Sequence, residues 1–354
     1  MEQITVKIPS TLDLPSALKL SVELAGIKNA SAIRADFKGV GLVEPFAMLM
    51  VSSELQRAAA RNQVQKFECV NHQSMSYASR MGFFQAFGYS STHRPGKKDG
   101  GSRHLPVNIL DCESLRKEAD SEYTDVGNVV EARSKHLATL LCGVDNGDIF
   151  ETLSYSLREI MRNVVEHSES KQFGICAQYW PTKHKVEVAI LDRGVGLRRT
   201  LSRNPHLDVN NDRSAMNYAL MPAVSGRAFK GARKQHGPWA NSGFGLYMTS
   251  RICRNGGNFF IASGGHGMLL TKTKEGKSYF PCSYEGTAVR LVIRTDQINS
   301  LADSLRRYRD EGFELQKKYR ELVQINPSAA SLMLSQDFDP SLWDKFLAAL
   351  RRSV

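Results

Sequence analysis

The hydrophobic pattern of the first hundred residues alternates between two periods. Short runs rich in apolar and β-branched residues predict strands, and each run is followed by a stretch with apolar residues at helical spacing. The predicted strands are QITVKIP, SAIRADF and VQKFECV, and the predicted helices are LPSALKLSVELAG, EPFAMLMVSSELQRAAARN and MSYASRMGFFQAFG. Strands separated by helices indicate βαβ units, so this part predicts an α/β fold with a mostly parallel sheet.

The pattern changes after residue 125. Two helical stretches, VVEARSKHLATLLCG and SLREIMRNVVEHS, precede the strand-like runs FGICAQYW and KVEVAILD, which the turn PTKHK joins. A segment rich in Gly, Pro, Asn and basic residues follows at 197–242, around the short helix RSAMNYALMPAV. The chain continues with the helix GFGLYMTSRICR and three predicted strands, NFFIASG, GMLLTKT and GTAVRLVI, which short turns make antiparallel.

These patterns divide the chain into four parts. We expect an α/β unit at 1–105, a linker at 106–125, a second α/β unit at 126–295 and a helical C-terminal extension at 296–354. The run from 91 to 103 is rich in Gly, Ser and Lys, which is typical of a loop between units.

Composition narrows the class of protein. With 354 residues, 42% of them hydrophobic and 23% charged, the chain is typical of a soluble globular protein and long enough for two domains. No apolar run approaches the roughly 18–20 residues that span a membrane, and the N-terminus lacks the apolar region of a secretory signal. The six scattered cysteines form no CxxC pair. We therefore expect a cytoplasmic protein with buried, reduced thiols and no membrane association.

The net charge of +11 leaves a polyanionic partner open. Part of the charge lies in two segments, 93–104 and 226–236. Neither has zinc-finger spacing or many interleaved aromatic residues, so nucleic-acid binding is the weakest of the alternatives.

The helical stretch SLREIMRNVVEHS places Glu159, Asn163 and His167 four residues apart, so they stack along nearly one face. Apolar residues flank this polar stripe, which puts it at the edge of a core, where a ligand can bind. Taken alone, however, the spacing favours a solvated helix face, because polar residues at helical spacing are common.

The segment AILDRGVGL ends a buried strand with Asp192 and continues with Gly194 and Gly196. A carboxylate there can accept a hydrogen bond from an exocyclic amine, and the glycines let a flat ring approach the backbone. A β-turn with an Asx cap is the alternative.

Two further segments contain glycines before regular structure. In NSGFGLYMTSRI, Gly243 and Gly245 precede an amphipathic helix, whose first N–H groups and dipole favour phosphate. In EGTAVRLVI, Gly286 and Thr287 open a strand, and the threonine hydroxyl can face the same pocket.

The order of these motifs over about 126–295 resembles that of the GHKL ATPases, the superfamily with the Bergerat ATP-binding fold. This superfamily includes DNA gyrase, heat-shock chaperones, MutL-type repair proteins and histidine kinases. EIMRNVVEHS is most similar to the anti-sigma-factor serine kinases and related ATPases, which have a histidine four residues after the asparagine. The resemblance implies an α/β sandwich, a mixed sheet with helices on one face.

The resemblance also implies a role for each residue of the helix motif. Asn163 would coordinate the Mg²⁺ that bridges the ATP phosphates. Glu159 would be the general base that activates a water or a protein hydroxyl. His167 would contact phosphate or cap the helix, and both roles stay open.

The other motifs would bind the nucleotide itself. Asp192 would accept from the adenine amino group, with Thr287 nearby through water. The adenine pocket would be shaped by Gly194 and Gly196. The phosphates would be bound by Gly243, Gly245 and Leu246.

The segment 197–242 would be the ATP lid, with one basic residue reaching the γ-phosphate. Arg193 departs from the family pattern, which often has a small or amide residue there. The candidates for the γ-phosphate contact are Arg227, Lys230, Arg233 and Lys234.

The N-terminal unit resembles a STAS domain, the fold of the anti-sigma-factor antagonists. The cues are a strand, a turn, a long apolar helix, a strand and a short helix ending in GFFQAFG. Such domains carry an acceptor serine where this chain has GLVEPF, so we do not expect phosphorylation there. In two-gene switches the STAS protein is the substrate of the kinase, whereas here the two parts are fused.

The sequence therefore predicts a Mg²⁺-dependent, ATP-binding regulatory protein of the GHKL class, either an ATPase or a serine/threonine-kinase-like enzyme. Expected partners are ATP and a protein, either a component of a sigma-factor or anti-sigma pathway or a defence-system subunit, and a homodimer is left open. The alternatives are an ATP-gated switch without catalysis and a nucleic-acid-associated GHKL ATPase. The chain lacks the helix pair of a histidine kinase and the second catalytic domain of gyrase or MutL.

Overall fold

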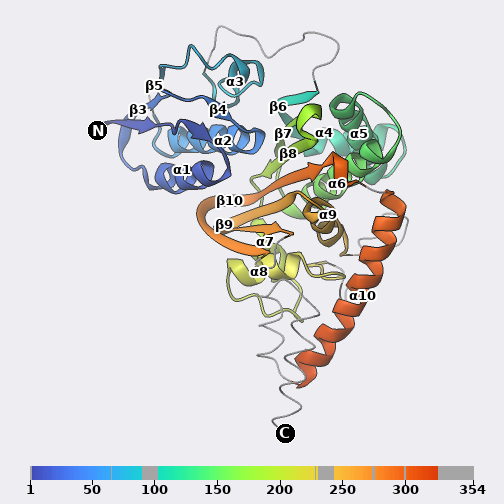
Figure 1. Ribbon diagram of the computed structural model, residues 1–354. Helices are drawn as coiled ribbons and strands as arrows, with labels where there is room; N and C mark the ends of the chain where they lie inside the picture. The colour runs from blue at the N-terminus through green and yellow to red at the C-terminus, as the bar shows by residue number, and fades with distance from the viewer. Residues whose placement is uncertain are drawn as a thin grey trace.

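The computed structural model of the chain describes residues 2–64, 66–89, 103–227, 229, 243–272, 276–298 and 300–325. Over these residues the protein is a mixed α/β structure with one larger antiparallel sheet and one smaller parallel sheet (Figure 1). The α/β class predicted from the sequence is confirmed at this level.

The N-terminal unit is built on a three-stranded parallel sheet in the order β1-β3-β5. Its strands are β1 (Glu2–Lys7), β3 (Ala30–Asp36) and β5 (Lys66–Val70), and a two-stranded pair is formed by β2 (Thr11–Leu12) and β4 (Leu42–Val43). The helices are α1 (Leu14–Gly26), α2 (Pro45–Arg61), α3 (Ser76–Arg80) and the short η1 (Gln85–Phe87). The strand and helix order predicted here is confirmed, except that the third helix is divided into two short pieces.

Local sequence explains where the two long helices begin. Asp13 caps α1, because its carboxylate accepts from the Ser16 N–H at 3.1 Å and the Ser16 hydroxyl accepts from the Asp13 N–H at 2.8 Å. Pro45 opens α2, in the first turn, where a missing N–H costs nothing.

The second unit contains a five-stranded sheet in the order β6-β7-β8-β10-β9. Every neighbouring pair in it is antiparallel, so the expected mixed sheet is wrong for this unit. The strands are β6 (His104–Asp111), β7 (Gln172–Trp180), β8 (Lys185–Asp192), β9 (Asn258–Thr271) and β10 (Lys277–Arg294). The last two form one long hairpin, in which the predicted strands NFFIASG and GMLLTKT are joined in β9 and GTAVRLVI is the second half of β10.

The predicted linker at 106–125 is also wrong. Most of it belongs to the second unit, as the edge strand β6 and the helix α4 (Cys112–Ser121). An edge strand keeps one side exposed, and Pro106 interrupts its apolar pattern, so β6 lacks the signature of a buried strand.

The remaining helices of the second unit cover one face of the sheet and surround its end (Figure 1). They are α5 (Val126–Cys142), α6 (Asp148–Asn163), the π-helical turn η2 (Val164–Ser168), η3 (Pro181–Lys183), α7 (Gly196–Leu201), α8 (Asp212–Ala219), α9 (Gly245–Arg254) and η4 (Thr295–Gln297). The long helix α10 (Leu301–Ile325) packs on α9 and extends away from the sheet, which confirms a helical extension as far as residue 325. The rest of the predicted extension, 326–354, lies outside the described residues.

The large sheet is buried on both faces. Along β8, Val188 and Ile190 pack into the core beneath α5 and α6, whereas Ala189 and Leu191 pack into the core of the N-terminal unit. Helices α1 and α2 contact this second face, across β7, β8 and β10. The N-terminal unit therefore closes the back of the sheet, and the two units share a core.

A buried polar network joins the two units at the start of α2. The Arg290 guanidinium on β10 contacts Glu187 on β8 at 2.9 Å and Glu44, which precedes α2, at 3.0 Å. Lys185 lies 3.1 Å from Glu44, and the N–H of Phe46 donates to Glu187 at 3.2 Å. The free-energy cost of burying these charged side chains is offset by their ion pairs and hydrogen bonds.

The six cysteines are free and buried, as the sequence predicts. Among the described residues, no helix has the length and apolar character needed to cross a membrane.

Candidate functional site

A cavity of about 470 Å³ lies between α6, α9 and the ends of β8 and β10. Its volume is in the range of small-molecule sites. Eight residues predicted from separate motifs line it: Glu159, Asn163, His167, Asp192, Gly243, Gly245, Leu246 and Thr287. The fold thus brings the four motifs to one place.

The deep end of the cavity is apolar except for one carboxylate. Asp192 ends β8 opposite Thr287 of β10 and is only 2% exposed. Its Oδ1 accepts from the Gly194 N–H at 2.7 Å. Burial raises the pKa of Asp192 to about 6, although hydrogen bonds from Gly194 and Thr287 act in the opposite direction. Ile190 and Ile261 line the same end. A buried acceptor among apolar walls can select a flat ligand that carries an amine.

The other end of the cavity is polar and is formed by α6. The Glu159 carboxylate accepts from Arg158 through Oε1, at 2.8 Å from Nη2, and its Oε2 lies against Gly245 at the start of α9. The Nδ2 atom of Asn163 is buried and has no hydrogen-bond partner within the described part of the chain. An amide held in this way is suited to a polar ligand in the cavity.

His167 lies in the π-helical turn that follows Asn163. Burial and the nearby charges of Arg227, Arg162 and Arg203 lower its pKa to about 4. The imidazole is therefore neutral at physiological pH, and the cationic groups around it favour an anion. Of the four basic residues expected to reach phosphate, Arg227 is near this end, while Lys230, Arg233 and Lys234 lie outside the described residues.

The N-terminus of α9 faces this polar end. Gly245 begins the helix and Leu246 follows it, and both line the cavity. The first N–H groups of a helix have no partner within it and carry the positive end of its dipole. Gly243 adopts a φ of 70°, and a side chain there would meet the backbone of Ala223 and Val224. Gly243 therefore lets the turn before α9 pack closely against this segment.

Gly194 and Gly196, which were expected to shape the adenine pocket, are not among the residues that line the cavity, although the Gly194 N–H donates to Asp192. A Cβ atom on Gly194 would overlap the carbonyl of Ser168, and one on Gly196, which has a φ of 73°, would lie 2.8 Å from the Ser263 hydroxyl. These glycines let the loop after β8 pack closely against other parts of the protein.

Two arginines of the site were missed in the sequence. Arg158 and Arg162 precede Glu159 and Asn163, and both line the cavity. The guanidinium of Arg158 lies 4.9 Å from the centre of the Tyr155 ring. Arg162 donates to Glu166, one turn further along the helix. The two arginines are themselves four residues apart, on the helix face beside the polar stripe of Glu159, Asn163 and His167, and this spacing could have indicated them.

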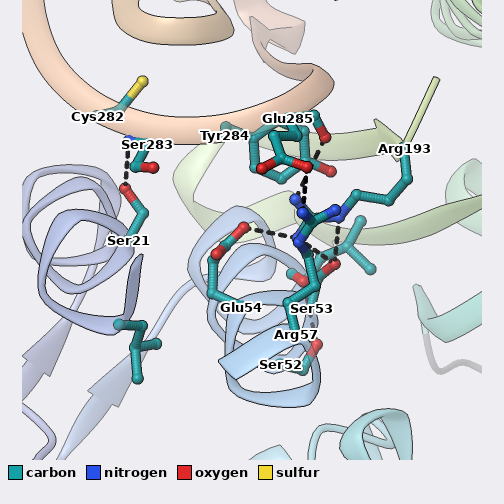
Figure 2. Close-up of polar contacts among 12 residues, drawn as sticks. Ser21, Ser52, Ser53, Glu54, Arg57, Arg193, Cys282, Ser283, Tyr284 and Glu285 are labelled. Atoms are coloured by element: carbon teal, nitrogen blue, oxygen red, sulfur yellow. Dashed lines mark hydrogen bonds and ion pairs between the residues drawn. The ribbon is translucent and has the colours of Figure 1, made fainter. Parts of the chain in front are cut away.

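Arg193 does not enter the cavity. Its side chain points in the opposite direction, toward α2 of the N-terminal unit (Figure 2). The departure from the family pattern at this position therefore leaves the cavity itself unchanged.

The cavity combines a buried acceptor at its apolar end with a helix N-terminus and arginines at its polar end. Such an arrangement can bind an elongated ligand that has a flat, amine-bearing ring and an anionic group. Comparison with protein-family models, with curated proteins and with solved structures gives no match.

Proposed function

We propose that the protein binds ATP with Mg²⁺ in this cavity and acts as a regulatory phosphoryl-transfer protein of the GHKL class, an ATPase or a serine/threonine-kinase-like enzyme. The observation that carries the proposal is the convergence of four motifs, spread from residue 159 to residue 287, on one cavity of about 470 Å³. Motifs with unrelated structural roles would not be expected to line the same cavity.

The two ends of the cavity match the two ends of the nucleotide. The adenine amino group would donate to the Asp192 carboxylate, with the ring between Ile190 and Ile261. The phosphates would lie at the N-terminus of α9, where Gly245 and Leu246 offer backbone N–H groups. Arginines at the same end would balance the phosphate charge.

Asn163 is the residue that fits Mg²⁺. Its side-chain amide is buried at the phosphate end with an unpartnered Nδ2, and its oxygen is a hard ligand of the type that Mg²⁺ prefers. When bound, Mg²⁺ would neutralise developing charge on the phosphates. The protein needs to supply few ligands, since Mg²⁺ usually keeps several waters and phosphate oxygens.

Glu159 is the proposed general base, because it lies at the phosphate end with its carboxylate between Arg158 and Gly245. The same geometry favours a second candidate function. Arg158 holds Oε1 at 2.8 Å, and a carboxylate engaged with a guanidinium is a weaker proton acceptor. ATP binding would then act as a switch, with slow or absent hydrolysis.

The N-terminal unit would be a STAS-like regulatory domain acting through a protein partner. Its segment GLVEPF leads into α2, where Glu44 pairs with Lys185 and Arg290 on the back of the sheet. This face is opposite the helices that form the cavity. The domain is therefore not placed as a substrate of its own active site, which supports a separate protein as the phosphoryl acceptor or docking partner.

The test compares ATP binding and turnover. Calorimetry with ATP and Mg²⁺ should show binding by the wild type and by Glu159→Gln, whereas phosphate release or partner labelling should be lost only in Glu159→Gln. Glu151→Gln, at an exposed position on the same helix, is the matched control. Failure of the wild type to bind ATP would overturn the proposal, and tight binding without turnover would favour the switch.

A further inference from the structure

Arg193 directly follows the buried Asp192 and ties this loop to the N-terminal unit (Figure 2). Its Nη2 lies 2.6 Å from Glu54 Oε1 and 2.6 Å from the Ser53 hydroxyl, both on α2, and its Nε lies 3.1 Å from the same hydroxyl. Glu54 is only 2% exposed, so this is a desolvated ion pair and not a surface contact.

The same guanidinium also holds the strand beside Asp192. It stacks over the Tyr284 ring at 4.1 Å and donates to the Glu285 carbonyl at 3.3 Å. The Tyr284 hydroxyl in turn donates to the backbone carbonyl of Asp192 at 3.0 Å. Arg193 thus adds side-chain contacts to the strand pairing that already holds the Asp192 backbone.

The structure leaves room for this arginine to move. A small cavity of about 80 Å³ lies beside it, between α2 and the back of the sheet, and is lined in part by Ser53, Arg193 and Tyr284. The interface is therefore not close-packed beside the guanidinium.

We propose that Arg193 is a positioning residue that couples the Asp192 end of the cavity to helix α2, so that the N-terminal unit sets the affinity for the nucleotide. The inference rests on the proposed ATP site and adds its regulation. Coupling of this kind is reciprocal: whatever α2 does to ATP affinity, ATP does equally to the stability of the α2 contact. A partner that alters the Arg193 contact with α2 would thereby change the affinity for nucleotide.

A second ion pair at the interface provides the control. Arg57, one turn further along α2, pairs with the side chain of Glu285, which is largely exposed. The pair joins the same two units through the Glu285 side chain, whereas Arg193 contacts the backbone carbonyl of Glu285. A variant of Arg57 therefore removes a charged contact across the interface and leaves the Arg193 contacts with Ser53 and Glu54 in place.

The experiment uses the full chain and two kinds of variant at the Arg193 contact. Arg193→Met combined with Glu54→Gln removes both charges and leaves no unpaired buried ion, and Ser53→Ala removes two hydrogen bonds without removing a charge. Calorimetry measures ATP affinity, and hydrogen exchange of the α2 amides is measured with and without ATP. Melting temperatures identify any variant that fails to fold.

We expect the double variant to bind ATP about tenfold more weakly, in the usual range of coupling between sites, and Ser53→Ala to shift affinity in the same direction by a smaller factor. ATP should slow exchange in α2 of the wild type and of Arg57→Met but not of the double variant. Wild-type affinity in a folded double variant, or equal protection of its α2, would overturn the coupling. Absence of ATP binding by the wild type would instead overturn the proposed function.

Discussion

Replacing Asp192 by asparagine tests whether the carboxylate at the apolar end is kept for a ligand at a cost to stability. Burial raises its pKa to about 6 from a usual value of 3.8. A group whose pKa is raised by folding contributes stability below its unfolded pKa, and this contribution is lost as the pH rises through the folded pKa. Asparagine has nearly the same shape and does not titrate.

The two pKa values set the size of the effect. At pH 5 the folded carboxyl lies about one unit below its pKa of about 6, while the unfolded carboxyl is mostly ionised. The wild type therefore gains about 1.4 kcal/mol at pH 5 relative to pH 8. The difference in free energy of unfolding between the variant and the wild type should change by this amount, with the variant relatively more stable at pH 8.

Urea unfolding followed by circular dichroism at both pH values measures this difference. Asp120→Asn, at an exposed position of α4, is the control and should show a much smaller change. In parallel, the Asp192→Asn variant should bind ATP at least about tenfold more weakly, because a hydrogen bond to a charged acceptor is lost. A stability difference that is the same at pH 5 and pH 8 would refute the argument that burial raises this pKa.

Three further predictions follow from the site and the interface. Gly245→Ala should slow ATP turnover with little loss of stability, because the new Cβ displaces the Glu159 carboxylate while alanine favours the helix; unchanged turnover would contradict this. Wild-type affinity for ATP should fall about tenfold between pH 7 and pH 5, as Asp192, with its pKa of about 6, becomes protonated. Calorimetry of Asp192→Asn at the same two pH values measures the part of the fall that comes from protonation of ATP itself. An equal fall in affinity for both proteins would contradict the role of Asp192. Arg290→Met should lower the free energy of unfolding by about 3 kcal/mol, because the buried Glu187 loses its guanidinium partner and keeps only Lys185 and the Phe46 N–H; a urea midpoint like that of the wild type would exclude this role.

The local sequence pattern was sufficient to predict most of the helices and strands and most of the residues that line the cavity. The apolar alternation of KVEVAILD gives β8, and the four-residue spacing of Glu159, Asn163 and His167 places all three at one cavity. These features depend on neighbours within a few turns or residues, which a sequence displays directly.

The rest depends on contacts between distant parts of the chain. Arg193 and Glu54 are 139 positions apart, and nothing near either residue indicates that they meet. The close packing at Gly194 and Gly196 could not be predicted for the same reason, since the atoms nearest to their missing side chains come from Ser168 and Ser263. Strand β6 was missed because an exposed edge strand has no strict alternation.

The core shared by the two units limits how this chain can be rearranged. The Phe46 ring of α2 meets the Phe260 ring of β9 edge to face, with centroids 5.4 Å apart, and Leu191 and Tyr284 lie in the same apolar layer. A shortened chain that begins at residue 103 would expose this layer to water. A large exposed apolar patch promotes self-association. The two units are therefore not interchangeable modules: they should melt in a single transition, and a recombined gene that paired either unit with a foreign partner would have to rebuild the buried surface of both.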